Sequence, residues 1–127
     1  MEPLRVLVVD DNQAHADGLV ELLGLAGFEA SRVETGAEGI EFARKLALDA
    51  VLLDVNLPDM LGFEVCQRLR SDPRTAHIAV IFHTGSSPLP SDKHDWDAIL
   101  TYPVQMSDVY AAVRGCVERR RRGVMAK

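Results

Sequence analysis

Residues 48–54 read Leu-Asp-Ala-Val-Leu-Leu-Asp, an apolar run that ends in the carboxylate of Asp54. Residues 4–11 read Leu-Arg-Val-Leu-Val-Val-Asp-Asp, a second run that ends in the pair Asp10 and Asp11. Short, nearly continuous apolar runs are typical of strands buried on both faces of a parallel sheet. Carboxylates at the ends of buried strands are costly unless something compensates their charge. The two runs therefore predict a site that holds a hard cation.

Strand and helix patterns alternate along the rest of the chain. The patterns predict five strands, at residues 4–9, 28–33, 50–53, 78–82 and 98–101. Helical spacing of apolar residues fills most of the intervals and follows the last strand. The exception is the interval before the fifth strand, where residues 85–90 are loop by composition and only residues 91–96 could form a helical turn or two. This alternation predicts a parallel sheet covered by helices on both faces.

Connection rules narrow the topology of that sheet. Because crossovers between parallel strands are right-handed, five such strands fit the flavodoxin-like order 2-1-3-4-5, and the expected fold is a doubly wound α/β sheet. In this order the first and third strands are neighbours, and ligands bind beside their carboxyl ends. We therefore expect Asp10, Asp11 and Asp54 to meet in space.

Length and composition suit a single globular domain. The chain has 127 residues, of which 47% are hydrophobic and 26% charged, and these are ordinary values for such a domain. No apolar run reaches the roughly 20 residues that span a bilayer, and the N-terminus shows no signal-peptide pattern. We therefore expect a cytoplasmic location and no membrane contact.

Cys66 and Cys116 fall at apolar positions of helical patterns, which favours buried free thiols over a metal site.

The charge is distributed unevenly. Arg119 to Arg122 account for +4 of the net charge of −5, so the rest of the chain carries −9. An acidic body does not favour nucleic acid as a partner, and a short arginine run is more often a solvated helix end or the start of a linker. We expect one domain at residues 1–118, followed by a basic C-terminal tail or linker at residues 119–127.

The predicted acid cluster has its own chemistry. Three carboxylates within a few ångströms repel one another, and a divalent cation relieves that repulsion. Oxygen ligands without histidine or thiol favour Mg²⁺, Mn²⁺ or Ca²⁺ over zinc. A carboxylate beside such a cation can also act as a nucleophile and take up a phosphoryl group as an aspartyl phosphate.

The chain resembles the receiver domain of two-component response regulators, from Val6 to about Val117. The matching segments are Val8-Val9-Asp10-Asp11-Asn12, the stretch from Asp54 to Gly62, His83-Thr84-Gly85 and Tyr102-Pro103. The order and spacing of these segments together make the match specific, whereas an isolated pair of aspartates would be a weak signal.

The resemblance implies a role for each matching residue. Asp54 matches the phosphoacceptor, while Asp10 and Asp11 match the acid pair that binds Mg²⁺ or Mn²⁺. The backbone carbonyl of Asn56 matches the third protein ligand, and Thr84 matches the hydroxyl that bonds the phosphoryl group. The family implies a histidine kinase or phosphotransfer protein as phosphodonor and a downstream protein partner. It implies no enzyme activity beyond self-catalysed phosphoryl transfer and autodephosphorylation, and it leaves a homodimer open.

Two positions of the resemblance depart from the family pattern and two keep it. Tyr102 stands where the family has a lysine, and a tyrosine hydroxyl can donate a hydrogen bond but brings no charge. Ile99 stands where the family has a switch aromatic, and we expect Trp96 to pack at the sheet edge rather than to replace it. Gly85 matches a small residue that in the family leaves the site open to a phosphodonor. Pro103 matches a proline whose preceding peptide bond is typically cis.

The connection between Thr84 and Tyr102 is shorter than in the family, and Pro88 and Pro90 interrupt it. We expect the family's fourth helix to be reduced to a turn or remodelled as loop. Lys93, in the same connection, could reach the site in place of the missing lysine, although surface lysines are usually solvated.

The sequence leaves three functions open. The first is a receiver domain phosphorylated on Asp54, in which the modified state biases a protein-binding surface. The second is a receiver-like module that binds a protein partner without phosphorylation, which Tyr102, Ile99 and the short connection favour. The third is an enzyme such as a metal-dependent phosphatase, which would need a cap domain or a second general acid, for which His15 and His83 are candidates.

Overall fold

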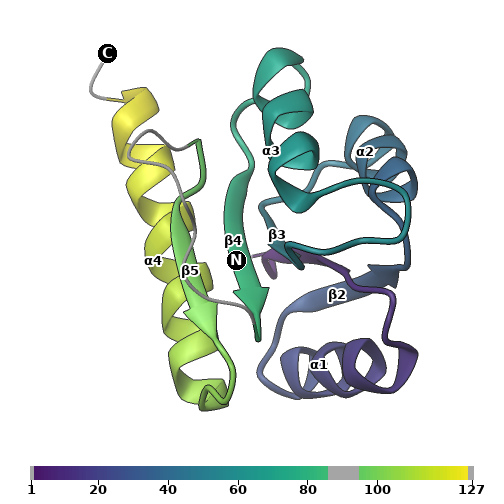
Figure 1. Ribbon diagram of the computed structural model, residues 1–127. Helices are drawn as coiled ribbons and strands as arrows, with labels where there is room; N and C mark the ends of the chain where they lie inside the picture. The colour runs from purple at the N-terminus through teal and green to yellow at the C-terminus, as the bar shows by residue number, and fades with distance from the viewer. Residues whose placement is uncertain (1, 86–94, 126–127) are drawn as a thin grey trace.

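The computed structural model describes residues 2–85 and 95–125. Its five strands form one parallel sheet with the order β2-β1-β3-β4-β5, which confirms the predicted fold (Figure 1). The strands are β1 (Arg5–Val9), β2 (Glu29–Val33), β3 (Ala50–Leu53), β4 (Ala79–Thr84) and β5 (Ala98–Thr101). The helices among the described residues are α1 (Gln13–Leu25), α2 (Gly36–Lys45), α3 (Gly62–Ser71) and α4 (Met106–Met125).

Helices cover both faces of the sheet (Figure 1). Side chains of α1 and α4 share one core cluster, and those of α2 and α3 share the other. In β1, Val6 and Val8 belong to the first cluster, whereas Leu7 and Val9 belong to the second. Burial on both faces explains why the strands read as continuous apolar runs rather than as alternating ones.

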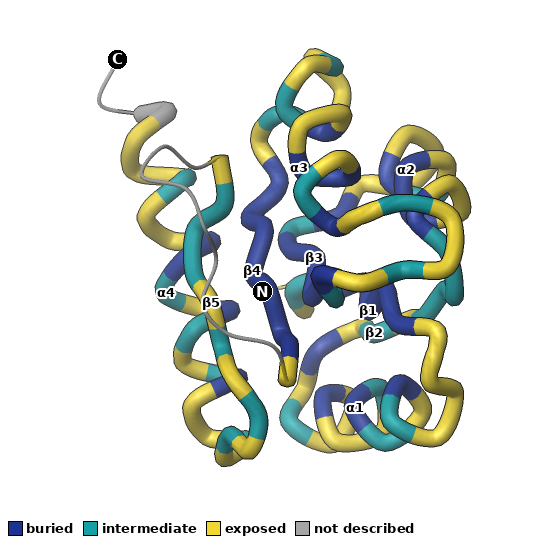
Figure 2. The backbone as a smooth tube through the Cα atoms, viewed as in Figure 1, coloured by how far each residue is buried: buried dark blue, intermediate teal, exposed yellow. Residues whose placement is uncertain are grey.

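Strand β4 is buried along its whole length (Figure 2). It runs from Ala79 to Thr84, so it ends two residues beyond its predicted end. The reason is the neighbouring strand, because His83 and Thr84 pair with Leu100 and Thr101 of β5. The longer strand carries His83 and Thr84 to the same edge of the sheet at which β1 and β3 end.

Local hydrogen bonds fix where the helices begin and end. The Asn12 side chain accepts the His15 N–H at 3.1 Å and so caps α1, and Thr35 caps α2 by accepting the Glu38 N–H at 3.1 Å. Gly27 follows α1 with a φ of 98°, a conformation that favours glycine and commonly ends a helix. Because α1 starts directly after the acid pair, its first turn lies beside the carboxyl edge of the sheet.

Asp97, just before β5, ties the C-terminal part of α4 to the rest of the domain. Its carboxylate pairs with Arg120 of α4 at 2.8 Å and with Arg70 of α3 at 2.9 Å. Helix α4 continues to Met125, so the domain boundary predicted at residue 118 falls inside a continuous helix whose Arg120 contacts the body. A linker beyond the helix stays a prediction.

The sequence predicts a remodelled connection between β4 and β5. The reduced fourth helix, Pro88, Pro90 and Lys93 all fall within residues 86–94, outside the described residues. Trp96 follows this segment and packs against the rings of Phe82 and Phe63, with centroids 5.4 and 5.6 Å away. This contact agrees with the packing role predicted for Trp96.

The structure also bears on two expectations drawn from composition. Cys66 and Cys116 are both buried and free, as predicted. Burial raises the pKa of the Cys66 thiol to about 11, so this thiol stays protonated and packs as an apolar group. Across residues 2–85 and 95–125, no helix is both long and apolar enough to cross a bilayer.

Candidate functional site

The ends of β1 and β3 bring three carboxylates together. The two strands are neighbours, with Val9 opposite Leu53, so the residues that follow them leave the sheet side by side. One carboxylate oxygen from each of Asp10, Asp11 and Asp54 lies within 4.8 Å of the other two. The acid cluster predicted from the two apolar runs is therefore present.

Asp54 is the half-buried member of this cluster. Its carboxylate accepts the Asn56 N–H at 3.3 Å. Burial raises the pKa of Asp54 above its usual range, and the negative charges of Asp10 and Asp11 raise it further, while the hydrogen bond from Asn56 opposes them. A nearby positive charge would therefore stabilise the ionised form of this carboxylate.

The loop from β3 to α3 is fixed by contacts of its own backbone and of one side chain. Asn56 and Leu61 form an antiparallel bridge that closes the loop. The Asp59 carboxylate accepts the N–H groups of Ala37 and Gly36 at 2.9 and 2.8 Å, which lowers the pKa of Asp59. The loop is thereby anchored to the start of α2. The use of the Asn56 carbonyl as a metal ligand stays a prediction.

Asp10 is the most buried member of the cluster, with 5% of its surface exposed. One of its carboxylate oxygens accepts the Asn12 N–H at 2.9 Å, and the other lies 2.7 Å from Nδ1 of His15. The sequence suggests His15 only as a general acid and does not reveal this contact with Asp10. The sequence signal for this contact is the position of His15 in the first turn of the helix that follows the acid pair.

Tyr102, which follows β5, reaches the cluster through His15. Its hydroxyl lies 3.1 Å from His15 Nδ1, and its ring meets the rings of His15 and His83 edge-on, with centroids 4.6 and 4.2 Å away. Burial raises the pKa of Tyr102 well above its usual range, and the charges of Asp10 and Asp54 add to this. Tyr102 therefore acts as a neutral hydrogen-bonding group, in contrast to a lysine.

His83 lies on the α1 and α4 side of the sheet, facing the rings of His15 and Tyr102. Neither of its ring nitrogens has a hydrogen-bond partner within the described part of the chain. Burial, followed by the proximity of His15, lowers the pKa of His83 to about 4, so the ring is neutral at pH 7. An enclosed neutral imidazole is poorly placed to protonate a leaving group, and this weakens the phosphatase hypothesis.

The remaining predicted site residues lie around the ends of β4 and β5. Thr84 is 1% exposed, and its backbone carbonyl accepts the Tyr102 N–H at 2.9 Å. The peptide bond between Tyr102 and Pro103 is cis, as the resemblance implied. Ile99 is 42% exposed and so presents an aliphatic side chain at the surface. Roles of Thr84, Ile99 and Pro103 in switching stay predictions.

The donor set of the acid cluster fits a hard divalent cation. It offers one oxygen from each of three carboxylates, with Asp11 exposed to solvent and Asp10 buried. Oxygen donors of this kind suit Mg²⁺ or Mn²⁺, which also retain water and share their ligand shell with phosphate oxygens. Asp10, Asp11 and Asp54 are the residues that would hold such an ion.

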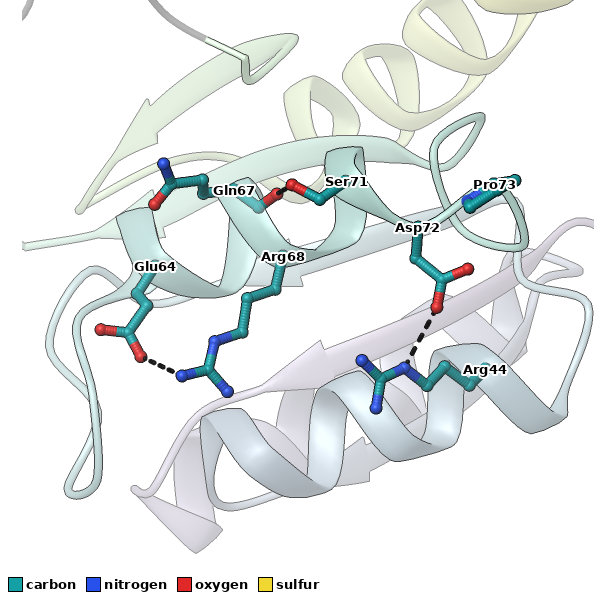
Figure 3. Close-up of a pocket in the computed structure, with 7 residues that line it drawn as sticks. All are labelled: Arg44, Glu64, Gln67, Arg68, Ser71, Asp72 and Pro73. Atoms are coloured by element: carbon teal, nitrogen blue, oxygen red, sulfur yellow. Dashed lines mark hydrogen bonds and ion pairs between the residues drawn. The ribbon is translucent and has the colours of Figure 1, made fainter.

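A separate groove of about 590 Å³ lies between α2 and α3 (Figure 3). Arg44 and Asp72 pair across it at 3.2 Å, and Arg68 pairs with Glu64 at 2.9 Å. These arginines are already matched by carboxylates near solvent, where ion pairs are weak. The acid cluster, rather than this groove, is the candidate site.

Comparison with known proteins agrees with this geometry. The family model of the response regulator receiver domain matches residues 6–113. The chain belongs to this family. Receiver domains are signalling modules of two-component systems rather than stand-alone enzymes.

Two relatives show how far the similarity extends. The DNA-binding dual master transcriptional regulator RpaA of Synechocystis is 34% identical over 119 residues, covering 91% of this chain and 49% of RpaA. The polar-differentiation response regulator DivK of Brucella anthropi is 34% identical over 79 residues, covering 62% of this chain and 64% of DivK. The matched region thus spans about half of RpaA and less than two thirds of DivK.

Solved structures share the fold. A CheY-like receiver domain protein from Methanospirillum hungatei superposes with a TM-score of 0.85 at 25% identity, covering 95% of this chain and 98% of that one. The response regulator TrrA of Thermotoga maritima, solved in complex with Mg²⁺ and BeF, gives 0.81 at 26% identity, covering 89% and 98%. These matches agree with the flavodoxin-like strand order.

Proposed function

We propose that this receiver domain accepts a phosphoryl group on Asp54 from a histidine kinase or a phosphotransfer protein, in a reaction that depends on Mg²⁺ or Mn²⁺. The phosphorylated domain then presents an altered surface to a downstream protein partner. The observation that carries this proposal is the convergence of Asp54 with Asp10 and Asp11 at the carboxyl edge of the sheet. The structure of TrrA with Mg²⁺ and BeF supports it by analogy.

The proposed reaction moves a phosphoryl group from nitrogen to oxygen. One oxygen of the Asp54 carboxylate attacks the phosphorus of a phosphohistidine on the donor. The P–N bond breaks, its electron pair stays with the imidazole, and a P–O bond to Asp54 forms. Attack of water on the phosphorus later returns the carboxylate and releases phosphate. A divalent cation bound at the cluster would offset the negative charge that gathers there.

The chain's own residues set how well the product is held. The Thr84 hydroxyl is proposed to bond a phosphoryl oxygen. Tyr102 is neutral and its hydroxyl is engaged by His15, so it supplies no charge to the product. Because charge-assisted hydrogen bonds are about twice as strong as neutral ones, we expect a less stabilised phosphorylated state than a lysine would give.

Two observations favour a second possible function. Tyr102 is tied to His15, and Ile99 is exposed where the family has a switch aromatic. Both features favour a module that binds its protein partner without phosphorylation. DNA binding is not carried over from RpaA, because the match covers only 49% of that protein. A cytoplasmic location and a homodimer stay predictions.

Beryllofluoride, which mimics a phosphoryl group on a carboxylate, separates the two functions. With Mg²⁺ present, we expect it to shift the backbone amide resonances of the residues that flank Asp54, Thr84 and Tyr102. The Asp54→Asn variant is the matched control and should show no such shifts. An unchanged wild-type spectrum, together with partner binding that persists, would favour the phosphorylation-independent module.

A further inference from the structure

The Asp10 carboxylate and the Tyr102 hydroxyl lie within hydrogen-bond distance of the same nitrogen of His15. His15 Nδ1 lies 2.7 Å from one oxygen of Asp10 and 3.1 Å from the Tyr102 hydroxyl. The other oxygen of Asp10 accepts the Asn12 N–H at 2.9 Å. Both oxygens of this candidate metal ligand are therefore already engaged by groups of the protein itself.

We propose that His15 is a positioning residue that competes with the divalent cation for Asp10, and that Tyr102 acts on the acid cluster through His15. His15 is not among the residues that carry the family resemblance, so the role belongs to this chain. The proposal rests on the proposed function, because that function places the cation at the cluster.

Of the two groups that contact Asp10, the more exposed His15 side chain is the one that a bound cation would displace. The Asp10 side chain is 7% exposed, and a desolvated carboxylate needs donors on its oxygens. The Asn12 N–H is a backbone donor fixed where α1 begins. The His15 side chain is 33% exposed, so it has room to turn toward solvent. A cation that draws on the oxygen facing His15 therefore weakens the His15 contact, and His15 lowers the affinity for the cation.

Tyr102 shares with Asp10 the nitrogen of His15 that makes the competing contact. Nδ1 carries at most one hydrogen, so when it donates to Asp10 the Tyr102 oxygen accepts from the same N–H, while the Tyr102 ring is backed by the buried ring of His83, 4.2 Å away. Within the described part of the chain, the recorded hydrogen-bond partner of this hydroxyl is His15. The effect of Tyr102 on Asp10 must then pass through His15, which makes the two side chains energetically dependent on each other.

Isothermal titration calorimetry with Mg²⁺ tests this dependence on four variants beside wild type. His15→Phe keeps a ring against Tyr102 and His83 but removes the hydrogen bond to Asp10. We expect it to bind Mg²⁺ about 3- to 10-fold more tightly, as the loss of one competing hydrogen bond implies. His15→Gln retains a donor and should bind with an affinity near that of wild type.

Tyr102→Phe completes the double-mutant cycle with His15→Phe. We expect Tyr102→Phe alone to weaken Mg²⁺ binding about 2-fold, because the His15 N–H is then donated to Asp10 alone, and to change nothing when added to His15→Phe. In the absence of Mg²⁺, His15→Phe should also unfold at a lower urea concentration, because a buried carboxylate oxygen has lost its donor. This second measurement is independent of any phosphorylation. Should His15→Phe fail to fold, His15→Ala introduces no bulk and gives the same comparison.

Each outcome of the titrations bears on the proposal. Equal or weaker Mg²⁺ binding by His15→Phe would overturn it, while the proposed function would stand because wild type binds the ion. Additive effects of the His15 and Tyr102 substitutions would overturn the part assigned to Tyr102. If neither wild type nor any variant binds Mg²⁺, both the competition and the metal dependence of the proposed function are wrong.

Discussion

Replacing Gly62 by alanine is expected to lower the free energy of unfolding by about 3 kcal/mol. Gly62 is the first residue of α3, and its N–H donates to the Val55 carbonyl at 2.7 Å. A Cβ atom at this position would overlap the backbone carbonyl oxygen of Asp54 and would lie 2.9 Å from Cε1 of Phe82. The overlap involves backbone, which cannot turn aside as a flexible side chain can. The start of α3 or the Asp54 peptide must therefore shift.

Gly24→Ala is the matched control for this substitution. Gly24 lies in α1, and a Cβ atom there would meet nothing within 4 Å. Alanine at that position should leave stability unchanged or raise it by about 0.5–1 kcal/mol. Urea unfolding measures both variants. If Gly62→Ala were as stable as Gly24→Ala, the close approach of α3 to Asp54 would be wrong.

Replacing His83 by leucine is expected to protect the domain against acid. Burial, aided by His15, lowers the pKa of His83 from 6.5 to about 4. The unfolded chain therefore binds a proton below pH 6.5 that the folded chain refuses until about pH 4. Stability is lost as the pH falls through this window, by about 3 kcal/mol in total. Leucine has no titrating nitrogen, so His83→Leu should escape this loss.

The measurement is the free energy of unfolding at pH 7, 5.5 and 4. The advantage of His83→Leu over wild type should grow toward pH 4, because the carboxylates titrate alike in both proteins. His77→Gln is the control, since His77 is exposed and its replacement should change stability by less than about 0.5 kcal/mol. Parallel loss of stability in wild type and His83→Leu would show that His83 is not desolvated.

Much of the fold can be predicted from local patterns in the sequence, namely apolar runs and the carboxylates that end them. The strands β1 and β3 read as apolar runs because both of their faces are covered, and their terminal carboxylates mark the edge where they end. Parallel pairing with right-handed crossovers then leaves few strand orders. The acid cluster of Asp10, Asp11 and Asp54 could be predicted for this reason, before any side-chain position was known.

Contacts between distant side chains could not be predicted in the same way. The hydrogen bond between His15 and Tyr102 joins residues 87 positions apart, and it depends on how α1 rotates against the end of β5. The same holds for Arg120, which the sequence assigned to a tail and which the structure places on Asp97. Strand ends also depend on neighbours, as β4 shows by continuing to Thr84.

Tyr102 combines a departure visible in the sequence with a contact visible only in the structure. The family resemblance places an uncharged side chain where a lysine is usual, and we expect a less stabilised phosphorylated state as a result. The structure adds that the hydroxyl is bonded to His15, which in turn holds Asp10. Loss of the lysine is thus accompanied by contacts that link the acid cluster to the end of β5 through His15 and Tyr102.

Intact-mass spectrometry after incubation with Mg²⁺ and acetyl phosphate tests the central claim most directly. Acetyl phosphate can donate its phosphoryl group to a carboxylate without a kinase, so the result depends on this domain alone. We predict one phosphoryl adduct on wild type, and none on Asp54→Asn or on wild type from which Mg²⁺ has been removed. An equal adduct on Asp54→Asn, or no adduct on wild type that binds Mg²⁺, would contradict Asp54 as the phosphoacceptor.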